Sequence, residues 1–332
     1  MLSLTETLEA YRDRAVVVTG GAGFIGSHLS RRLVAAGARV TVLDDLSSGR
    51  LENLDSVRGS IRFVQGSITD STALGESLEG ASIVFHEAAL ASVPRSIEEP
   101  ERYHLVNATG TLLLLEASRR STSPPRIVFA SSSSVYGADP SLPKREDGPL
   151  DPMSPYAQQK LAGEQMMRVW SLSYGIETVC LRYFNIFGPG QRADSAYAAV
   201  VAAFADAIRE GRAPTIYGDG TASRDFTYID NVVEANLRAG VAARGGGEAW
   251  AGQAMNIACG GRVTVVELAR LMADSNESAL EPKFTSPRPG DVPHSQADIS
   301  RARAWIGYEP TVGVAEGLKR TLAWYLNGEP AL

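Results

Sequence analysis

Short apolar runs alternate with longer segments of helical periodicity through the first half of the chain. The runs are rich in β-branched and aromatic residues, which are typical of strands, and they lie at 16–18, 40–43, 61–66, 82–89, 126–130 and 177–182. Between them, helical patterns occupy about 27–34, 103–120 and 156–174. This alternation predicts a parallel sheet with helices on both faces, an α/β fold of the doubly wound Rossmann type.

The second half of the chain is more irregular and richer in turn residues. It contains helical patterns at 199–210, 229–239 and 265–274, and few strand patterns. We expect a smaller α/β lobe over the carboxyl ends of the strands, where parallel sheets bind their ligands. The predicted division is a Rossmann domain of residues 1–184 with a returning segment near 226–256, and a substrate lobe of residues 185–225 and 257–332.

Composition and charge exclude several classes of function. The 332 residues carry a formal net charge of −6, which argues against a nucleic-acid partner. Cys180 and Cys259 lie in apolar contexts without the spacing of a metal site, so we expect free thiols and no bound metal. The N-terminal segment lacks the apolar stretch of a signal peptide, and the longest aliphatic run, 112–115, cannot span a bilayer. We therefore expect a cytoplasmic protein without membrane association.

The first predicted strand leads into the glycine-rich segment 20–26, which opens a helix. Gly20 can turn without a Cβ penalty, Gly23 lets the backbone approach a pyrophosphate, and Gly26 lets the helix pack closely on the strand. The pyrophosphate would lie at the positive N-terminus of that helix. The second strand ends at Asp44, about 20 residues further on, where a carboxylate can accept from a ribose 2′-hydroxyl but would repel a 2′-phosphate. This arrangement predicts NAD rather than NADP.

Tyr156 and Lys160 are one helical turn apart, so their side chains share a face. A phenol titrates near pH ~10 in water, and lowering its pKa to about 7 requires roughly 4 kcal/mol. A neighbouring ammonium and the positive charge of a nicotinamide ring could together supply that in a shielded cleft. The serine-rich turn 131–134 follows the fifth predicted strand and could share the proton. A solvated helix face is the alternative interpretation of the pair.

Motifs along nearly the whole chain resemble the extended short-chain dehydrogenases/reductases, specifically the NAD-dependent nucleotide-sugar epimerases. They are TGGAGFIGSHL from Thr19, LDDLSSG from Leu43, HEAALASVPRS from His86, SSSSVYG from Ser131, SPYAQQK from Ser154, LRYFNIFGP from Leu181, GDGTASRDFTYIDNV from Gly218 and RPGDVPHSQADIS from Arg288. Within the group, the resemblance is greatest to UDP-N-acetylglucosamine 4-epimerases.

The resemblance implies transient oxidation of a UDP-sugar at C4 by NAD, rotation of the 4-keto sugar, and reduction on its other face. Tyr156 would be the catalytic base, Lys160 its partner and ribose anchor, and Ser132 the proton relay. Cofactor-binding residues would be Gly20, Gly23, Phe24, Ile25, Asp44, Asp45, Ser48, Gly49, Ser67, Ile68, Ala88, Ala89, Asn107, Tyr156, Lys160 and Tyr183. Substrate-binding residues would be Ser92, Arg95, Ser132, Ser133, Tyr156, Asn185, Ala199, Val200, Tyr217, Arg224, Arg288, Asp291 and Ser295.

Some of these positions have a second interpretation. Ser67 stands where many relatives carry an aspartate in the adenine-contacting turn, although the amide of Ile68 could serve instead. Arg224 could pair with the adjacent Asp225 rather than with a nucleotide, and Asn185 could be a turn residue.

Ser295 bears on the choice of sugar. At the matching place, epimerases restricted to glucose and galactose carry tyrosine, whereas those that accept N-acetyl sugars carry something small. The resemblance therefore implies turnover of UDP-GlcNAc and UDP-GalNAc, with weaker activity on UDP-Glc and UDP-Gal. A turn residue after Pro293 is the alternative.

Other activities and assemblies stay open at this point. Dehydratases and decarboxylases carry carboxylates in the turn where this chain has 132–134, all serine, which disfavours them. A UDP-glucose or UDP-glucuronate 4-epimerase would share every catalytic residue, and a non-catalytic NAD-binding protein is the alternative from another class. The resemblance also implies a homodimer through the helices beginning near Tyr103 and Tyr156. Leucines 112–115 cover more than one helical face; complete burial within the subunit is the alternative.

Overall fold

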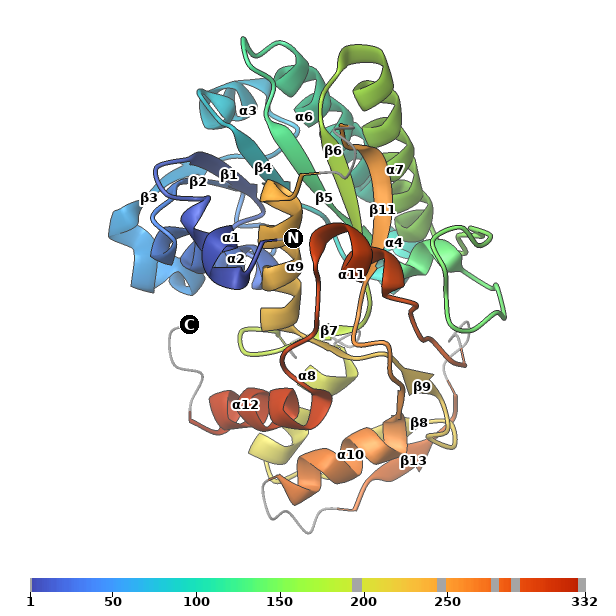
Figure 1. Cartoon of the computed structure of the whole chain (residues 1–332). Helices are drawn as coiled ribbons and strands as arrows, with labels where there is room; N and C mark the ends of the chain where they lie inside the picture. Colours follow the sequence, from blue (N-terminus) through green and yellow to red (C-terminus); the bar gives the residue numbers. More distant parts are fainter. Residues whose placement is uncertain (1, 193–198, 244–248, 276–280, 288–292, 328–332) are drawn as a thin grey trace.

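The computed structural model describes residues 2–192, 199–243, 249–275, 281–287 and 293–327. Its largest sheet has seven parallel strands in the order β11-β6-β5-β4-β1-β2-β3, with helices on both faces (Figure 1). The strands are β1 (Ala15–Thr19), β2 (Arg39–Asp44), β3 (Ile61–Gln65), β4 (Ile83–His86), β5 (Arg126–Ser132), β6 (Thr178–Tyr183) and β11 (Ala251–Ile257). The predicted α/β fold of the Rossmann type is confirmed.

Successive residues of each strand point to opposite faces of the sheet, and each face has its own core. One face packs against α2 (Phe24–Ala35) and α9 (Ile229–Val241). The other packs against α3 (Ser71–Leu78), α6 (Gly110–Arg119) and α7 (Pro155–Tyr174). Within β1, Val16 and Val18 belong to the first core and Val17 to the second. The strands are therefore apolar on both sides, as buried parallel strands are.

A second group of elements lies at the carboxyl end of the sheet, below it in Figure 1. It consists of α8 (Val200–Arg209), α10 (Val265–Asp274), α12 (Val314–Leu326), β8 (Thr215–Tyr217), β9 (Ser223–Arg224), β12 (Val263–Thr264) and β13 (Lys283–Thr285). The remaining elements are α1 (Leu4–Glu9), η1 (Leu51–Ser60), α4 (Val93–Glu98), η3 (Ser133–Tyr136), β7 (Ile186–Phe187), β10 (Thr227–Tyr228) and α11 (Ser300–Ile306). Within the described ranges, no helix is long and apolar enough to cross a membrane.

The structure differs from the sequence prediction in three elements. The helix expected at 103–120 is divided into α5 (Pro100–His104), a π-helical turn η2 (Leu105–Thr109) and α6. The strand expected at 82–89 ends at His86, because the backbone amide of Glu87 turns to the carbonyl of Thr19 and the next residues leave the sheet. The second half holds more strands than expected, since strands of two or three residues leave no alternation to detect.

Candidate active site

The turn between β1 and α2 forms a cradle for an anion. Gly20 has φ +68°, a left-handed conformation that favours glycine, and its Cα lies against the backbone of Ala88. A Cβ at Gly26 would collide with the carbonyl oxygen of Gly20. Gly23 is the N-cap of α2 and offers no capping side chain, so the first N–H groups of the helix remain for a ligand. This close backbone approach fits the pyrophosphate of NAD.

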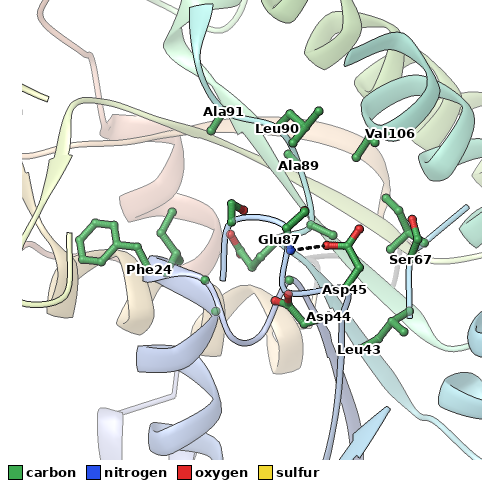
Figure 2. A pocket seen from close by; sticks show the side chains of 18 of the residues that line it. Phe24, Leu43, Asp44, Asp45, Ser67, Glu87, Ala89, Leu90, Ala91 and Val106 are labelled. Carbon is green, nitrogen blue, oxygen red and sulfur yellow. Dashed lines mark hydrogen bonds between the residues drawn. The ribbon is translucent and has the colours of Figure 1, made fainter. Parts of the chain in front are cut away.

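A cavity of about 300 Å³ begins at this cradle (Figure 2). Eleven of the predicted cofactor-binding residues line it: Gly20, Gly23, Phe24, Ile25, Asp44, Asp45, Ser48, Ser67, Ile68, Ala88 and Ala89. Gly49 lies just outside and packs against Ala22, so that a Cβ there would press on the Ala22 backbone. The cavity therefore joins residues from the carboxyl ends of β1, β2, β3 and β4.

Asp44 is held firmly at one end of this cavity. Its Oδ2 accepts from the backbone amide of Ala22 (2.9 Å) and its Oδ1 from that of Leu46 (2.8 Å). Burial raises the pKa of Asp44, and the two amide hydrogen bonds oppose that rise. Asp45 lies beside it and accepts from the amide of Ser47 at 2.9 Å (Figure 2). Each carboxylate oxygen has a second lone pair, so a ribose hydroxyl can still bind here.

We expect NAD⁺ to bind at least about 100-fold more tightly than NADP⁺, because Asp44 would repel a 2′-phosphate. Calorimetry on cofactor-free protein measures both dissociation constants. Asp44→Asn removes the negative charge and should bring the dissociation constants for NADP⁺ and NAD⁺ closer together. Equal affinities of the wild-type protein for the two cofactors would contradict the prediction.

The turn after β3 lies beside Asp44, whose backbone carbonyl accepts from the amide of Gly66 (3.0 Å). The Ser67 hydroxyl is already engaged within its own turn: it is hydrogen-bonded with the hydroxyl of Thr69 (2.9 Å) and accepts from the Thr69 amide (3.2 Å). It therefore does not offer an adenine the free carboxylate that an aspartate would. Ile68 is buried, with 4% of its surface exposed, and lines the same cavity. The side chain of Ser67 therefore shapes its own turn, and an adenine contact would fall to the backbone and to Ile68.

The three predicted catalytic residues come together at the carboxyl end of β5. Ser154 caps α7 by accepting from the amide of Ala157, and Pro155 fills the first turn, so α7 presents Tyr156 and Lys160 toward the sheet. Ser132 is the last residue of β5, and its hydroxyl lowers the pKa of the Tyr156 phenol. Nζ of Lys160 donates to the carbonyl of Ala130 (2.7 Å) and lies 5.9 Å from the centre of the Tyr156 ring.

In the protein without its cofactor, the pKa of Tyr156 is not lowered from its ordinary value. Burial raises it to about 12, although the hydrogen bond with Ser132 lowers it. Burial also lowers the pKa of Lys160 to about 8, against the opposite influence of the nearby Glu87 carboxylate. The sequence-based expectation counted the ammonium and left out desolvation, which dominates both groups. That expectation relied on two positive charges, the Lys160 ammonium and the nicotinamide ring. The first is present in the protein, and the second would come only with the bound cofactor.

Asn107 holds the loop after β4 in place. Its Oδ1 accepts from the amide of Leu90 (2.8 Å), and its Nδ2 donates to the carbonyl of Leu90 (3.0 Å) and to Oε1 of Gln159 on α7 (3.1 Å). It belongs to the π-helical turn η2, whose wider backbone sets this side chain between the loop and α7. Asn107 thus connects the cofactor cavity to the helix that carries Tyr156.

A second cavity, of about 270 Å³, lies in the lobe at the carboxyl end of the sheet. Five of the predicted substrate-binding residues line it: Asn185, Ala199, Val200, Tyr217 and Arg224. Ser92 and Arg95 are at the start of α4, where the hydroxyl of Ser92 caps the helix, and Ser133 follows Ser132 in η3. Arg288 and Asp291 lie outside the described residues.

Asn185 connects this cavity to Ser295. It has φ +36°, and its Nδ2 donates to the carbonyl of Asp225 (3.1 Å) and to Oγ of Ser295 (3.3 Å). Arg224 donates from Nη1 to the carbonyls of Ser223 (3.0 Å) and Pro293 (3.1 Å). The carboxylate of Asp225 instead accepts three backbone amides, those of Cys259, Gly260 and Ala297. Arg224 is thereby fixed at the rim of the cavity by backbone groups.

Several residues of the cofactor cavity were not predicted. They are Gly26, Leu43, Ser47, Asn53, Gly66, Glu87, Leu90, Ala91, Val106, Gly190 and Arg192. Glu87 is the one with a titratable carboxyl group close to Lys160. Its place directly before the predicted Ala88 and Ala89 was the available signal, but the strand pattern assigned it to the sheet.

Comparison with known proteins agrees with this geometry. The model of the NAD dependent epimerase/dehydratase family matches residues 16–258. UDP-glucose 4-epimerase of Mycolicibacterium smegmatis is 40% identical over 314 residues, which cover 94% of this chain and 98% of that protein. Among solved structures, UDP-N-acetylglucosamine 4-epimerase from Methanobrevibacter ruminantium M1 is 39% identical with a TM-score of 0.89, covering 95% of this chain and 99% of that one.

A third relative has been solved with its cofactor. UDP-glucuronic acid 4-epimerase from Bacillus cereus, in complex with UDP-glucuronic acid and NAD, is 29% identical with a TM-score of 0.84, covering 94% of this chain and 99% of that one. All three relatives are 4-epimerases of UDP-sugars, and they differ in the sugar. The predicted enzyme class, an NAD-dependent UDP-sugar 4-epimerase, and the NAD cofactor are confirmed at this level. The chain belongs to the NAD-dependent epimerase/dehydratase family.

Proposed function

We propose that this enzyme interconverts UDP-GlcNAc and UDP-GalNAc, with slower turnover of UDP-Glc and UDP-Gal. The observation that carries the choice of sugar is Ser295, a small half-buried residue whose hydroxyl accepts from Asn185 at the nucleotide-sugar cavity. The acetamido group at C2 needs room on the wall of the pocket while the keto sugar rotates. A serine leaves that room, and its hydroxyl can hydrogen-bond to an amide.

NAD held in the cofactor cavity would supply the acceptor and donor of a hydride for C4 of the sugar. Tyr156 takes the proton of the 4-hydroxyl, directly or through Ser132, as the hydride leaves. Lys160 holds the cofactor ribose and adds positive charge beside the phenol. Asn185 and Arg224 hold the diphosphate and nucleotide, because a guanidinium matches phosphate oxygens. The 4-keto sugar then turns within the cleft, and Tyr156 returns its proton.

The turn 132–134 disfavours elimination or decarboxylation, because its side chains are hydroxyls without a carboxylate for acid–base work. In the structure, Oγ of Ser134 donates to Oγ of Ser132 at 2.9 Å, so the turn orients the proton relay. An epimerase for UDP-glucose or UDP-glucuronate is the second candidate, since relatives of both kinds carry the same fold.

Incubation of the protein with each UDP-sugar, followed by NMR of the anomeric protons, tests the proposal. We expect kcat/KM to be highest for the N-acetyl pair and measurable for the plain pair. Highest turnover of UDP-glucuronate, or of UDP-glucose, would replace the proposed substrate with that sugar. A 4-keto-6-deoxy product or release of CO₂ would exclude epimerisation.

We also propose a homodimer through the exposed side of α7 and η2. Leu114 and Leu115 are fully buried inside the subunit, whereas Leu112 and Leu113 of the same run are half-buried, so at most part of the run could reach the interface. Leu105, Val169 and Leu172 are instead 51%, 50% and 65% exposed. A second copy of the chain would cover this apolar face.

A cytoplasmic location and the two-domain division remain part of the proposal.

Leu172→Glu is expected to convert the protein to a monomer, because it places a charge in the proposed interface. Light scattering at micromolar concentration measures the mass. The control is Phe284→Glu on β13, where a 57% exposed side chain lies in the other lobe and the dimer should persist. A wild-type monomer would refute the proposed assembly.

A further inference from the structure

Glu87 carries a carboxyl group into the cofactor cavity, and the reaction described above gives it no role. It follows β4 directly and lines the cavity together with the glycine cradle and Ala88–Ala91 (Figure 2). Its Oε1 accepts from the Tyr183 hydroxyl at 2.7 Å. That hydroxyl in turn accepts from Nδ2 of Asn236 at 2.8 Å. Tyr183 ends β6 and Asn236 lies on α9, so two rigid elements fix the position of the carboxylate.

The carboxylate follows β4, whereas Asp44 ends β2, two strands away in the sheet. It acts electrostatically on Lys160 and on Tyr156, the two groups of α7 that the hydride transfer requires. Asp44 and Asp45, at the end of β2, mark the end of the cavity for the adenosine ribose, the ribose that carries the 2′-phosphate in NADP. In the sheet, β1 lies between β2 and β4. The nicotinamide ring must bind beside Tyr156, because the hydride leaves C4 of the sugar while the proton leaves the hydroxyl oxygen on that same carbon. Glu87 therefore shares its end of the cavity with that ring.

Charge is the property that distinguishes the two redox forms of the cofactor at this end. The nicotinamide ring is positive in NAD⁺ and neutral in NADH. The Lys160 ammonium disfavours the positive ring, and a carboxylate at the Glu87 position favours it, in an environment where burial strengthens both effects. Replacing either charge by a neutral group should alter the affinity for NAD⁺ far more than that for NADH.

We propose that Glu87 is a positioning residue that sets the redox preference of the bound cofactor, favouring NAD⁺ over NADH against the opposing charge of Lys160. Oxidation of the sugar at C4 sends the hydride to the ring and the proton to Tyr156, and reduction reverses both, so no external oxidant is needed. A bias toward NAD⁺ drives the second half of this cycle and shortens the time for which the keto sugar can escape. The inference rests on the NAD cofactor and is independent of which sugar is the substrate.

Glu87→Gln tests this, because glutamine keeps the size and can still accept from Tyr183. Dissociation constants for NAD⁺ and NADH are measured by calorimetry on cofactor-free protein at about pH 7.5, between the pKa of Glu87 (about 7) and that of Lys160 (about 8), where most of the carboxylate and most of the ammonium are charged. We expect the ratio of the NAD⁺ constant to the NADH constant to rise by about tenfold. Glu87→Asp, which retains the charge, should keep the ratio within about threefold of the wild-type value.

Asp45→Asn is the matched control, since it removes a carboxylate that lines the same cavity but follows β2 rather than β4. It should alter the binding of both cofactor forms by the same factor and leave their ratio unchanged. An unchanged ratio in Glu87→Gln, or equal changes in the glutamine and aspartate variants, overturns the proposal, because size rather than charge would then be responsible.

The wild-type protein provides a second measurement that does not depend on how the variants fold. Burial raises the pKa of Glu87 to about 7, opposed by the Tyr183 hydrogen bond and by Lys160. The charged or titratable groups that act on or respond to it are Lys160, Tyr156 and Tyr183. As pH rises from about 6 to about 8, the carboxylate forms and Lys160 begins to lose its proton, and both changes should increase the preference for NAD⁺. A ratio that stays constant over this range overturns the proposal, and so does a rise of the same size in Glu87→Gln, which would assign the effect to Lys160.

Discussion

Tyr156→Phe is expected to lower kcat by about 10²- to 10⁴-fold, the usual contribution of a general acid–base group. The substitution removes one oxygen, the one that would take the proton, and the ring can still pack at the start of α7. Binding of NAD and of UDP should stay within a few-fold of wild type, because neither needs the phenol proton. NMR of the epimerisation and calorimetry of the two ligands measure these quantities.

The control for this variant is Tyr174→Phe at the other end of the same helix. Tyr174 is 50% exposed, and its ring contacts the guanidinium of Arg119, a contact that phenylalanine preserves. That variant should retain wild-type kcat. If Tyr156→Phe kept a tenth or more of the wild-type rate, Tyr156 would not be the base.

The high pKa of Tyr156 adds a pH dependence to the same prediction. Because burial holds it at about 12 in the free protein, only a small fraction of the phenol is ionised near neutral pH. Bound NAD⁺ should lower this pKa through its positive ring, and kcat should then rise with pH up to the lowered value. A kcat that falls between about pH 6 and about pH 8 would contradict a tyrosine base.

The sheet was predictable because its strands carry their signal locally. Val16–Val18 and Ile127–Phe129 are continuous β-branched and aromatic runs, as strands buried on both faces require. The strand β11 was not assigned, since it begins with Ala251, Gly252 and Gln253, and Gly252 breaks the register against β6. Its place in the sheet depends on packing beside β6, which no local pattern reveals.

The same distinction applies to the site. The glycine cradle and Asp44 follow from backbone requirements that a short motif records, and the structure brings them to one cavity. The raised pKa values of Glu87 and Tyr156 could not be predicted, because both depend on burial by elements distant in sequence. The Asn185–Ser295 hydrogen bond joins residues 110 positions apart and likewise needed the fold.

Ser295→Tyr is expected to suppress turnover of UDP-GlcNAc and UDP-GalNAc selectively. The backbone amide of Ser295 donates to the carbonyl of Ser223 (2.9 Å), and its hydroxyl accepts from Asn185. These two contacts join the residue to Ser223 and to Asn185, which lines the second cavity, so under the proposed function a phenol ring added here would extend beside the bound sugar. It would occupy the volume into which the acetamido group must swing as the keto sugar rotates.

We expect kcat/KM for the N-acetyl pair to fall by about 100-fold in Ser295→Tyr, while the plain pair stays within a few-fold, because a pocket rejects an oversized ligand better than an undersized one. Ser295→Ala is the matched control: it removes the hydrogen bond with Asn185 and adds no volume, so both pairs should change little and alike. NMR assays with all four sugars measure the ratio. An equal loss on both pairs in the tyrosine variant, or no loss on either, would mean that Ser295 does not gate the sugar; selective loss in the alanine variant as well would assign the effect to the hydroxyl rather than to size.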